Sequence, residues 1–198
     1  MKLLGTTTSP YTRKARIVLL ASGLPHELLD TRTDAGSAAL TQSAPLGKVP
    51  VLVGAGERGE LVLPDSSLIV SWLWGVAAPA LEAAGWNLDP RNVADRALQV
   101  VAEGALDAAI NHRYLRLDGF DDTGYIAKQR HRVERVLTWL DGRIPFQRPL
   151  GGAALSLGCA LDWIVFRSVI DLGRWRGLTA FRDAWTASGV GAGTEPRD

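Results

Sequence analysis

The residues near the start of the chain that are best suited to chemistry are Ser9-Pro10-Tyr11-Thr12. A dithiol redox motif of this kind would read Cys-Pro-Tyr-Cys, and thiol–disulfide exchange requires a thiolate. Here both outer positions carry hydroxyls, so the segment cannot exchange disulfides. A serine hydroxyl beside the free N–H groups of a helix N-terminus can instead bind and polarise the thiol of another molecule. The simpler interpretation, that Ser9 only caps its helix, stays open on this motif alone.

Two further segments carry the donors and acceptors needed to hold a peptide. Pro50 opens a strand, and a cis Val49-Pro50 bond would turn the backbone N–H and C=O of Val49 outward to pair with an extended ligand. At Asp65-Ser66, hydroxyl and N–H donors at a helix N-terminus suit a carboxylate, and Asp65 can accept from an α-ammonium group. Taken alone, each segment also has an ordinary structural explanation, as a strand-edge proline and as an N-cap pair.

The elements predicted around these segments alternate between strand and helix for about 80 residues. A parallel strand pair with a helical crossover, followed by an antiparallel hairpin, predicts a mixed four-stranded sheet. The predicted strands are 2–6, 26–30, 51–53 and 61–63, and the predicted helices are 11–22, 34–43 and 67–74.

From Arg91 onward the apolar spacing predicts only helices. We therefore predict an α/β domain at 1–77, a linker at 78–89 and an all-α domain at 90–198, with a loosely held end from Gly189. The first helical stripe is Val93, Ala97, Val101, Ala105 and Ala108. The second is Ile126, Val133, Leu137 and Leu140, in a helix that starts at Asp121-Asp122-Thr123 and stops at Gly142. The third is the apolar run 155–167, and the last is Leu178, Phe181 and Trp185.

Composition excludes several classes of function. The 198 residues carry a net charge of +1, which gives no electrostatic reason to expect nucleic acid or an anionic membrane as partner. No apolar run approaches the 18–20 residues of a membrane span, and the first residues lack the features of a signal peptide. The single cysteine, Cys159, lies in an apolar stretch and is expected to be a buried, inert thiol. These features predict a cytoplasmic protein.

Other signals are rejected. The stretch 54–59 matches G-x-G-x-x-G, but a strand pattern follows it where a dinucleotide site needs a helix, so it is interpreted as a hairpin turn. His26, His112 and His131 are too scattered to predict a metal site. Trp74 could line a cleft between the domains. The remaining tryptophans on helical faces are expected in the core: Trp72, Trp139, Trp163 and Trp185.

Taken together, the three segments resemble the glutathione S-transferase family. The resemblance covers essentially the whole chain and is strongest over residues 8–14, 45–52 and 65–69. It is similar to bacterial members with Ser-Pro-Phe/Tyr-x-Arg-Lys at the first helix. The resemblance implies a thioredoxin-like α/β N-terminal domain with a mixed four-stranded sheet, followed by an all-α helical bundle.

The resemblance also implies glutathione as co-substrate, activated for attack on a small hydrophobic electrophile or a peroxide in detoxification, and a homodimer formed through residues 67–74 and 91–116. Ser9 would face the glutathione sulfur. A non-catalytic binding or assembly module with the same fold is the alternative. The glutathione-binding residues implied are Ser9, Tyr11, Lys48, Val49, Pro50, Asp65 and Ser66. The pocket for the second substrate would be lined by Tyr11, Asn111, His112, Tyr114 and Arg116.

Two features call for explanation. Cations in the first turns of a helix are disfavoured by the helix dipole, so Arg13, Lys14 and Arg16 indicate either a nearby anionic ligand or a solvated face. Family members commonly begin the central helix of the second domain with Ser/Thr-x-x-Asp, whereas residues 151–154 read Gly-Gly-Ala-Ala. From this absence we expect that Gly151→Thr with Ala154→Asp would stabilise the chain by about 1 kcal/mol.

Overall fold

The computed structural model describes residues 1–56, 59–120 and 124–198, and the chain divides into two compact units. The first unit is Met1–Pro90 together with Gly191–Asp198, and the second is Arg91–Val190. The predicted end from Gly189 is therefore not loose, because its last eight residues pack into the first unit and bury Thr194.

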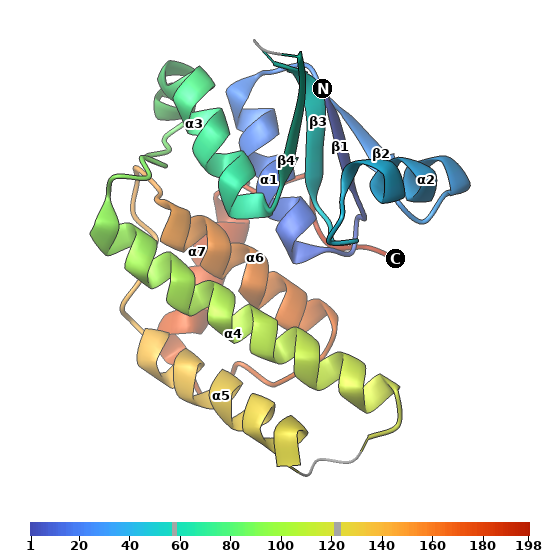
Figure 1. Cartoon of the computed structure of the whole chain (residues 1–198). Helices are drawn as coiled ribbons and strands as arrows, with labels where there is room; N and C mark the ends of the chain where they lie inside the picture. Colours follow the sequence, from blue (N-terminus) through green and yellow to red (C-terminus); the bar gives the residue numbers. More distant parts are fainter. Residues whose placement is uncertain (57–58, 121–123) are drawn as a thin grey trace. The chain divides into compact units, whose positions relative to one another are not determined.

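The first unit contains the predicted mixed four-stranded sheet, in the order β2-β1-β3-β4. β1 pairs parallel with β2 and antiparallel with β3, and β3 pairs antiparallel with β4. Figure 1 shows α1 and α3 on one face of the sheet and α2 on the other. The elements are β1 (Lys2–Gly5), α1 (Pro10–Ser22), β2 (Glu27–Asp30), α2 (Asp34–Ser43), β3 (Val51–Gly56), β4 (Gly59–Pro64) and α3 (Ser66–Ala83).

Apolar side chains hold α2 against the sheet. Leu4 of β1, Val51 of β3 and Ala44 after α2 form a buried cluster, against which Leu29 and Leu40 pack. The G-x-G-x-x-G stretch is a hairpin as predicted, since its flanking strands pair through Gly56 and Gly59. Residues 57 and 58 of this stretch lie outside the described residues.

Residues 78–83 of the predicted linker at 78–89 are helical. α3 continues beyond Trp74 to Ala83, bending at Ala77 (φ −138°), two residues before Pro79. A proline inside a helix removes one hydrogen bond and crowds the preceding turn, which accounts for the bend. The helix persists past the bend because Ala77 and Leu81 are buried, and Trp86 and Leu88 beyond it are buried too.

The second unit is built from α4 (Val93–Leu117), α5 (Gly124–Leu140), α6 (Gly152–Phe166) and α7 (Arg176–Ala187). The predicted stripes of α5 and α7 are buried, and α6 is buried on almost every side. The proposed start of α5 at residues 121–123 lies outside the described residues.

Two predictions about the core of this unit are wrong. In the predicted stripe of α4, Ala105 and Ala108 are buried as expected, but Val93 is 76% exposed and Ala97 is exposed. The buried face also includes Gln99, Ala102 and Ala109. Trp139 is 43% exposed and is covered by the Arg143 guanidinium, 4.6 Å from the ring centroid. Trp163, Trp185 and Cys159 are buried as expected.

Among the described residues, one helix, α3, is long and apolar enough to cross a membrane by length and composition, with a mean hydropathy of 1.2 over 18 residues. This is weak evidence of a membrane span, because the core helix of a folded domain passes the same test. α3 packs against α1 within the first unit.

Candidate functional site

The register of the sheet brings the three segments singled out from the sequence to one end of the first unit. Leu4 near the end of β1 pairs with Val51 at the start of β3, and Val51 pairs with Pro64 at the end of β4. The loops attached to these three strand ends carry the three segments (Figure 1). Because neighbouring strands lie about 4.8 Å apart, the segments share one edge of the sheet.

Ser9 is the N-cap of α1. Its backbone is extended (φ −77°, ψ 123°), and its Oγ accepts a hydrogen bond from the Thr12 backbone N–H at 3.1 Å. Pro10 occupies the first helical position, where its missing N–H costs nothing. A hydroxyl that accepts one hydrogen bond still has its own proton to donate. Capping and donation to a ligand are therefore compatible roles for this side chain.

The Val49-Pro50 peptide bond is cis, which is one of the two alternatives that the sequence left open. The carbonyl oxygen of Pro50 accepts the backbone N–H of Asp65 at 3.3 Å, which ties this loop to the start of α3. Lys48, before the cis bond, is exposed. Two of the three segments are thus joined by a direct hydrogen bond.

Asp65 is the N-cap of α3 and has an unusual backbone conformation, with φ at 91°. Its Oδ1 accepts from the backbone N–H groups of Ser67 at 2.7 Å and Leu68 at 3.0 Å. A non-glycine residue with positive φ costs on the order of 1–3 kcal/mol and occurs most often at functional sites. The cap engages one carboxylate oxygen and leaves Oδ2 for another donor. Ser66 beside it is buried.

Two of the cations of α1 are buried, so they do not form the solvated face that was one alternative suggested by the sequence. Lys14 is 2% exposed, and its Nζ donates to the Ser67 Oγ of α3 at 2.9 Å. Arg13 is also buried, and its Nε donates to the Oγ1 of Thr194 at 3.2 Å. Sequence reasoning missed both roles. The spacing of Lys14 from the buried Ile17 and Val18 was a usable signal, because residues three and four apart share a helix face.

The residues predicted to line the pocket for the second substrate lie on α4, in the other unit. Asn111 and Arg116 are exposed, His112 is half-buried and Tyr114 is 54% exposed. Their role in that pocket stays a prediction, as does the role of Tyr11, which is half-buried near the start of α1.

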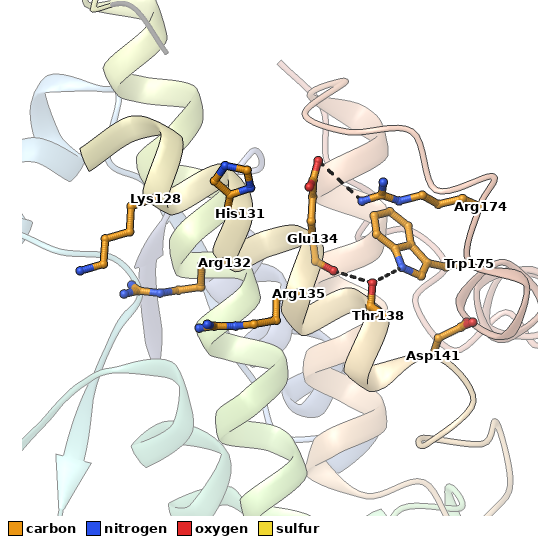
Figure 2. A pocket seen from close by; sticks show the side chains of 9 residues that line it. All are labelled: Lys128, His131, Arg132, Glu134, Arg135, Thr138, Asp141, Arg174 and Trp175. Atoms are coloured by element: carbon orange, nitrogen blue, oxygen red, sulfur yellow. Dashed lines mark hydrogen bonds and ion pairs between the residues drawn. The ribbon is translucent and has the colours of Figure 1, made fainter. Parts of the chain in front are cut away.

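A pocket of about 780 Å³ in the second unit contains none of the predicted site residues. Figure 2 shows Lys128, Arg132 and Arg135 extending from one side of α5, with Glu134 and Thr138 turned toward Arg174 and Trp175. Trp175 Nε1 donates to Thr138 Oγ1 at 3.0 Å, and Glu134 pairs with Arg174 at 3.6 Å. These contacts join α5 to the segment before α7 at one side of the pocket.

Comparison with known proteins gives consistent matches. The sequence model of the glutathione S-transferase N-terminal domain matches residues 3–79. The uncharacterized GST-like protein YibF of Escherichia coli (strain K12) is 30% identical over 177 residues, covering 85% of this chain and 84% of that protein.

Solved structures match over the whole length. A glutathione S-transferase from Methylobacillus flagellatus KT with GSH bound is 26% identical, with a TM-score of 0.82, and 99% of each chain is covered. One from Methylobacterium radiotolerans in complex with glutathione sulfonate is 26% identical, with a TM-score of 0.78, covering 100% of this chain and 95% of that one. The predicted fold class, a thioredoxin-like α/β domain with a helical domain, is confirmed.

Proposed function

This chain belongs to the glutathione S-transferase family, and from that premise we propose that it binds glutathione and activates its thiol for attack on a small electrophile. The observation that carries the proposal is the gathering of the Ser9, Pro50 and Asp65 segments at one end of one sheet. The glutathione compounds bound in the two related structures support the choice of ligand.

Ser9 is proposed as the catalytic residue. Its Oγ accepts the Thr12 N–H, which polarises the hydroxyl and improves it as a donor. Donation of that proton to the glutathione sulfur would favour the thiolate and lower the pKa of the bound thiol, with about 1.4 kcal/mol of preferential stabilisation for each pKa unit. The positive end of the α1 dipole acts in the same direction.

The remainder of glutathione would be held by the other two segments. The backbone of Val49, with Pro50, would pair with the cysteinyl part as an added strand does. Lys48 would reach the glycyl carboxylate. Ser66 would donate to the γ-glutamyl carboxylate, and the free Oδ2 of Asp65 would accept from the α-ammonium group.

The thiolate would then attack the second substrate. With a carbon electrophile, a carbon–sulfur bond forms and the leaving group departs with its electron pair. With a peroxide, the sulfur takes one oxygen of the O–O bond to give a sulfenic acid, and the other oxygen leaves and is protonated to an alcohol. A second glutathione then converts the sulfenic acid to a disulfide and water. Tyr11 and the α4 residues are proposed to line this part of the site: Asn111, His112, Tyr114 and Arg116.

We further propose a homodimer in the cytoplasm. The predicted interface carries exposed apolar side chains on two helices, including Leu68 on α3 and Val93 and Val100 on α4. The buried thiol of Cys159 supports a reducing compartment.

The test compares Ser9→Ala and Ser9→Gly with the unaltered chain. Both variants lose the hydroxyl, but glycine is nearly as good an N-cap as serine, whereas alanine costs about 1 kcal/mol of helix stability. Both should bind glutathione by calorimetry and should lose about 10- to 100-fold in turnover of an activated aryl halide, the size of one hydrogen bond to a charged group. The ultraviolet absorbance of bound thiolate should appear at higher pH.

Ser37→Ala on α2, where the side chain is exposed, is the matched control and should behave as the unaltered chain. If turnover is lost in Ser9→Ala but kept in Ser9→Gly, Ser9 is only a helix cap. A chain that is not retained on immobilised glutathione would instead be a non-catalytic module with the family fold.

A further inference from the structure

The segment 191–198 folds back onto the first unit and is anchored by a buried threonine. Thr194 is 1% exposed. Its Oγ1 donates to the carbonyl of Gly191 at 2.7 Å and accepts from Arg13 Nε at 3.2 Å. A buried hydroxyl with both a donor and an acceptor partner has its hydrogen bonds satisfied. These bonds fix the position of the segment against α1.

The same segment follows α1 back to the loop that precedes Ser9. Arg16 Nη2 donates to the carbonyl of Gly193 at 3.1 Å, and the Thr7 hydroxyl donates to the carbonyl of Arg197 at 2.9 Å. Figure 1 shows the C-terminus near the start of α1. The contacts thus hold positions on both sides of Ser9, at Thr7 before it and at Arg13 after it.

These anchors act directly on the backbone that carries the Ser9 hydroxyl. The Arg13 backbone N–H donates to the carbonyl of Ser9 at 2.9 Å, in the first turn of α1. On the other side, Thr7 also accepts from Arg32 Nη2 at 3.1 Å, and Arg32 is held by Asp30 at 2.7 Å. The loop is therefore fixed from β2 and from the 191–198 segment together.

The segment 191–198 stays bound to α1 although positively charged side chains repel one another there. Burial, and then the nearby guanidinium groups of Arg197 and Arg13, lower the pKa of Arg16, while Glu195 acts in the opposite direction. The three hydrogen bonds described above go to neutral acceptors, which are two carbonyls and the Thr194 hydroxyl. Glu195 also attracts Arg16, and Asp198 attracts Arg32. The directional hydrogen bonds specify the position of the segment more sharply than these attractions between charges do.

We propose that the segment 191–198 positions the Ser9 hydroxyl toward the glutathione sulfur, with Thr194 as the positioning residue. The inference rests on the proposed function of Ser9. Its physical basis is that a displacement of about 1 Å in a reacting group can cost orders of magnitude in rate, so a loop that carries a catalytic hydroxyl needs support from outside.

Thr194→Val tests this inference because it keeps the shape of the side chain and removes the acceptor for Arg13. We expect turnover to fall by about 3- to 10-fold, less than the full size of the lost charge-assisted hydrogen bond, because Thr194 acts on Ser9 only through Arg13. The glutathione KM should change less than about twofold. The pH at which bound thiolate appears should rise. Thr194→Ser, which restores the hydroxyl, should restore turnover and that pH, a rescue that a role in stability alone does not predict.

Thr186→Val, at an exposed threonine of α7, is the matched control and should leave both readouts unchanged. If Thr194→Val does not fold, the pair Thr7→Val and Thr7→Ser tests the other anchor in the same way. If Thr194→Val or Thr7→Val folds and has normal turnover and an unshifted thiolate titration, the positioning role of the segment is overturned. That result by itself leaves the proposed function of Ser9 intact. If Ser9→Ala also leaves both unchanged, the proposed function of Ser9 has failed as well.

Discussion

At the scale of single residues, the site is built from side chains that also hold the fold. The Ser9 hydroxyl caps α1 through the Thr12 N–H, and Asp65 caps α3 through two N–H groups with one of its two carboxylate oxygens. Ser9 can still donate its hydroxyl proton, and Asp65 can still accept a hydrogen bond at Oδ2. Substitutions that preserve the cap while removing that capacity can therefore separate stability from ligand chemistry.

Ser9→Cys should convert the site to thiol chemistry. A thiol at a helix N-terminus ionises easily, so the variant should attack glutathione disulfide and form a mixed disulfide, with release of one glutathione. With threonine at position 12, no second thiol stands in the motif to resolve it. Mass spectrometry should show one bound glutathione. Thr186→Cys, near the C-terminal end of α7, is the control and should react more slowly at neutral pH; equal rates would contradict the expectation.

Asp65→Asn should separate capping from recognition of the α-ammonium group. The Asn side-chain oxygen can accept from Ser67 and Leu68 as the carboxylate does, so the urea midpoint should stay nearly constant. Loss of the negative charge should weaken glutathione binding by about tenfold or more, as expected for one charge-assisted contact. Calorimetry measures the affinity. Asp65→Ala should lose both stability and affinity, and an Asn variant with full affinity would exclude the proposed contact.

At the scale of elements, the start of α6 shows a helix capped by another helix. Gly151 supplies no side-chain cap, but the two carboxylate oxygens of Asp95 on α4 each lie 3.3 Å from the Ala153 backbone N–H. A Cβ at position 151 would lie 2.2 Å from Asp95 Oδ1. The glycine is therefore required by the close approach of the carboxylate, and the helix start is not uncapped.

The stabilisation expected from the sequence for Gly151→Thr with Ala154→Asp is thus reversed by the structure. The threonine would displace the Asp95 carboxylate, and the aspartate introduced at position 154 would add a second charge at a buried site. We expect a loss of about 1–3 kcal/mol in urea unfolding. Asp95→Ala alone should cost about 1–2 kcal/mol. In a chain that carries Asp95→Ala, the double substitution should recover part of the stability lost with Asp95. If the double substitution changes stability equally with and without Asp95, Asp95 is not the cap.

Asp95 also gives a prediction about pH. Burial raises the pKa of its carboxyl above the ordinary value, although hydrogen bonds from Ala153 and Gly152 act against the shift. A raised folded-state pKa contributes stability that is present below the unfolded value of about 3.9 and is lost as pH rises through the folded value. Asp95→Asn keeps an acceptor without the charge. The urea midpoint of the variant, relative to that of the unaltered chain, should therefore rise as the pH increases from about 4 to 7. A difference that does not change with pH would contradict this.

At the scale of the whole molecule, each unit has its own core, and residues distant in sequence complete the first unit. Gly191–Asp198 packs with Met1–Pro90, so residues from both ends of the chain form the first unit. The exposed apolar side chains of α3 and α4 lie on the helices predicted to form the dimer interface.

Light scattering should therefore give twice the 21.3 kDa mass of one chain. Val100→Glu places a charge at a position that is 63% exposed in the single chain, so it should leave the fold intact and shift the mass toward one chain. Leu20→Glu, at a similarly exposed position of α1 outside the predicted interface, should leave the mass unchanged. A 21.3 kDa particle for the unaltered chain would exclude the dimer.

The sequence by itself determined the order of strands and helices, the hairpin at 54–59 and the Ser9 cap. These depend on local periodicity and on side chains within a few residues of each other. It also singled out the three segments proposed to form the site, because their residue types carry the chemistry.

Only the tertiary structure decided the contacts between residues far apart in the chain. Asp95 caps a helix 58 residues away, Lys14 reaches Ser67, and Arg13 reaches Thr194 across 181 residues. The continuation of α3 past Gly75 and Pro79 likewise depends on the burial of Ala77 and Leu81. No local pattern encodes such pairings, because each one exists only where packing brings a donor and an acceptor together and removes water from both.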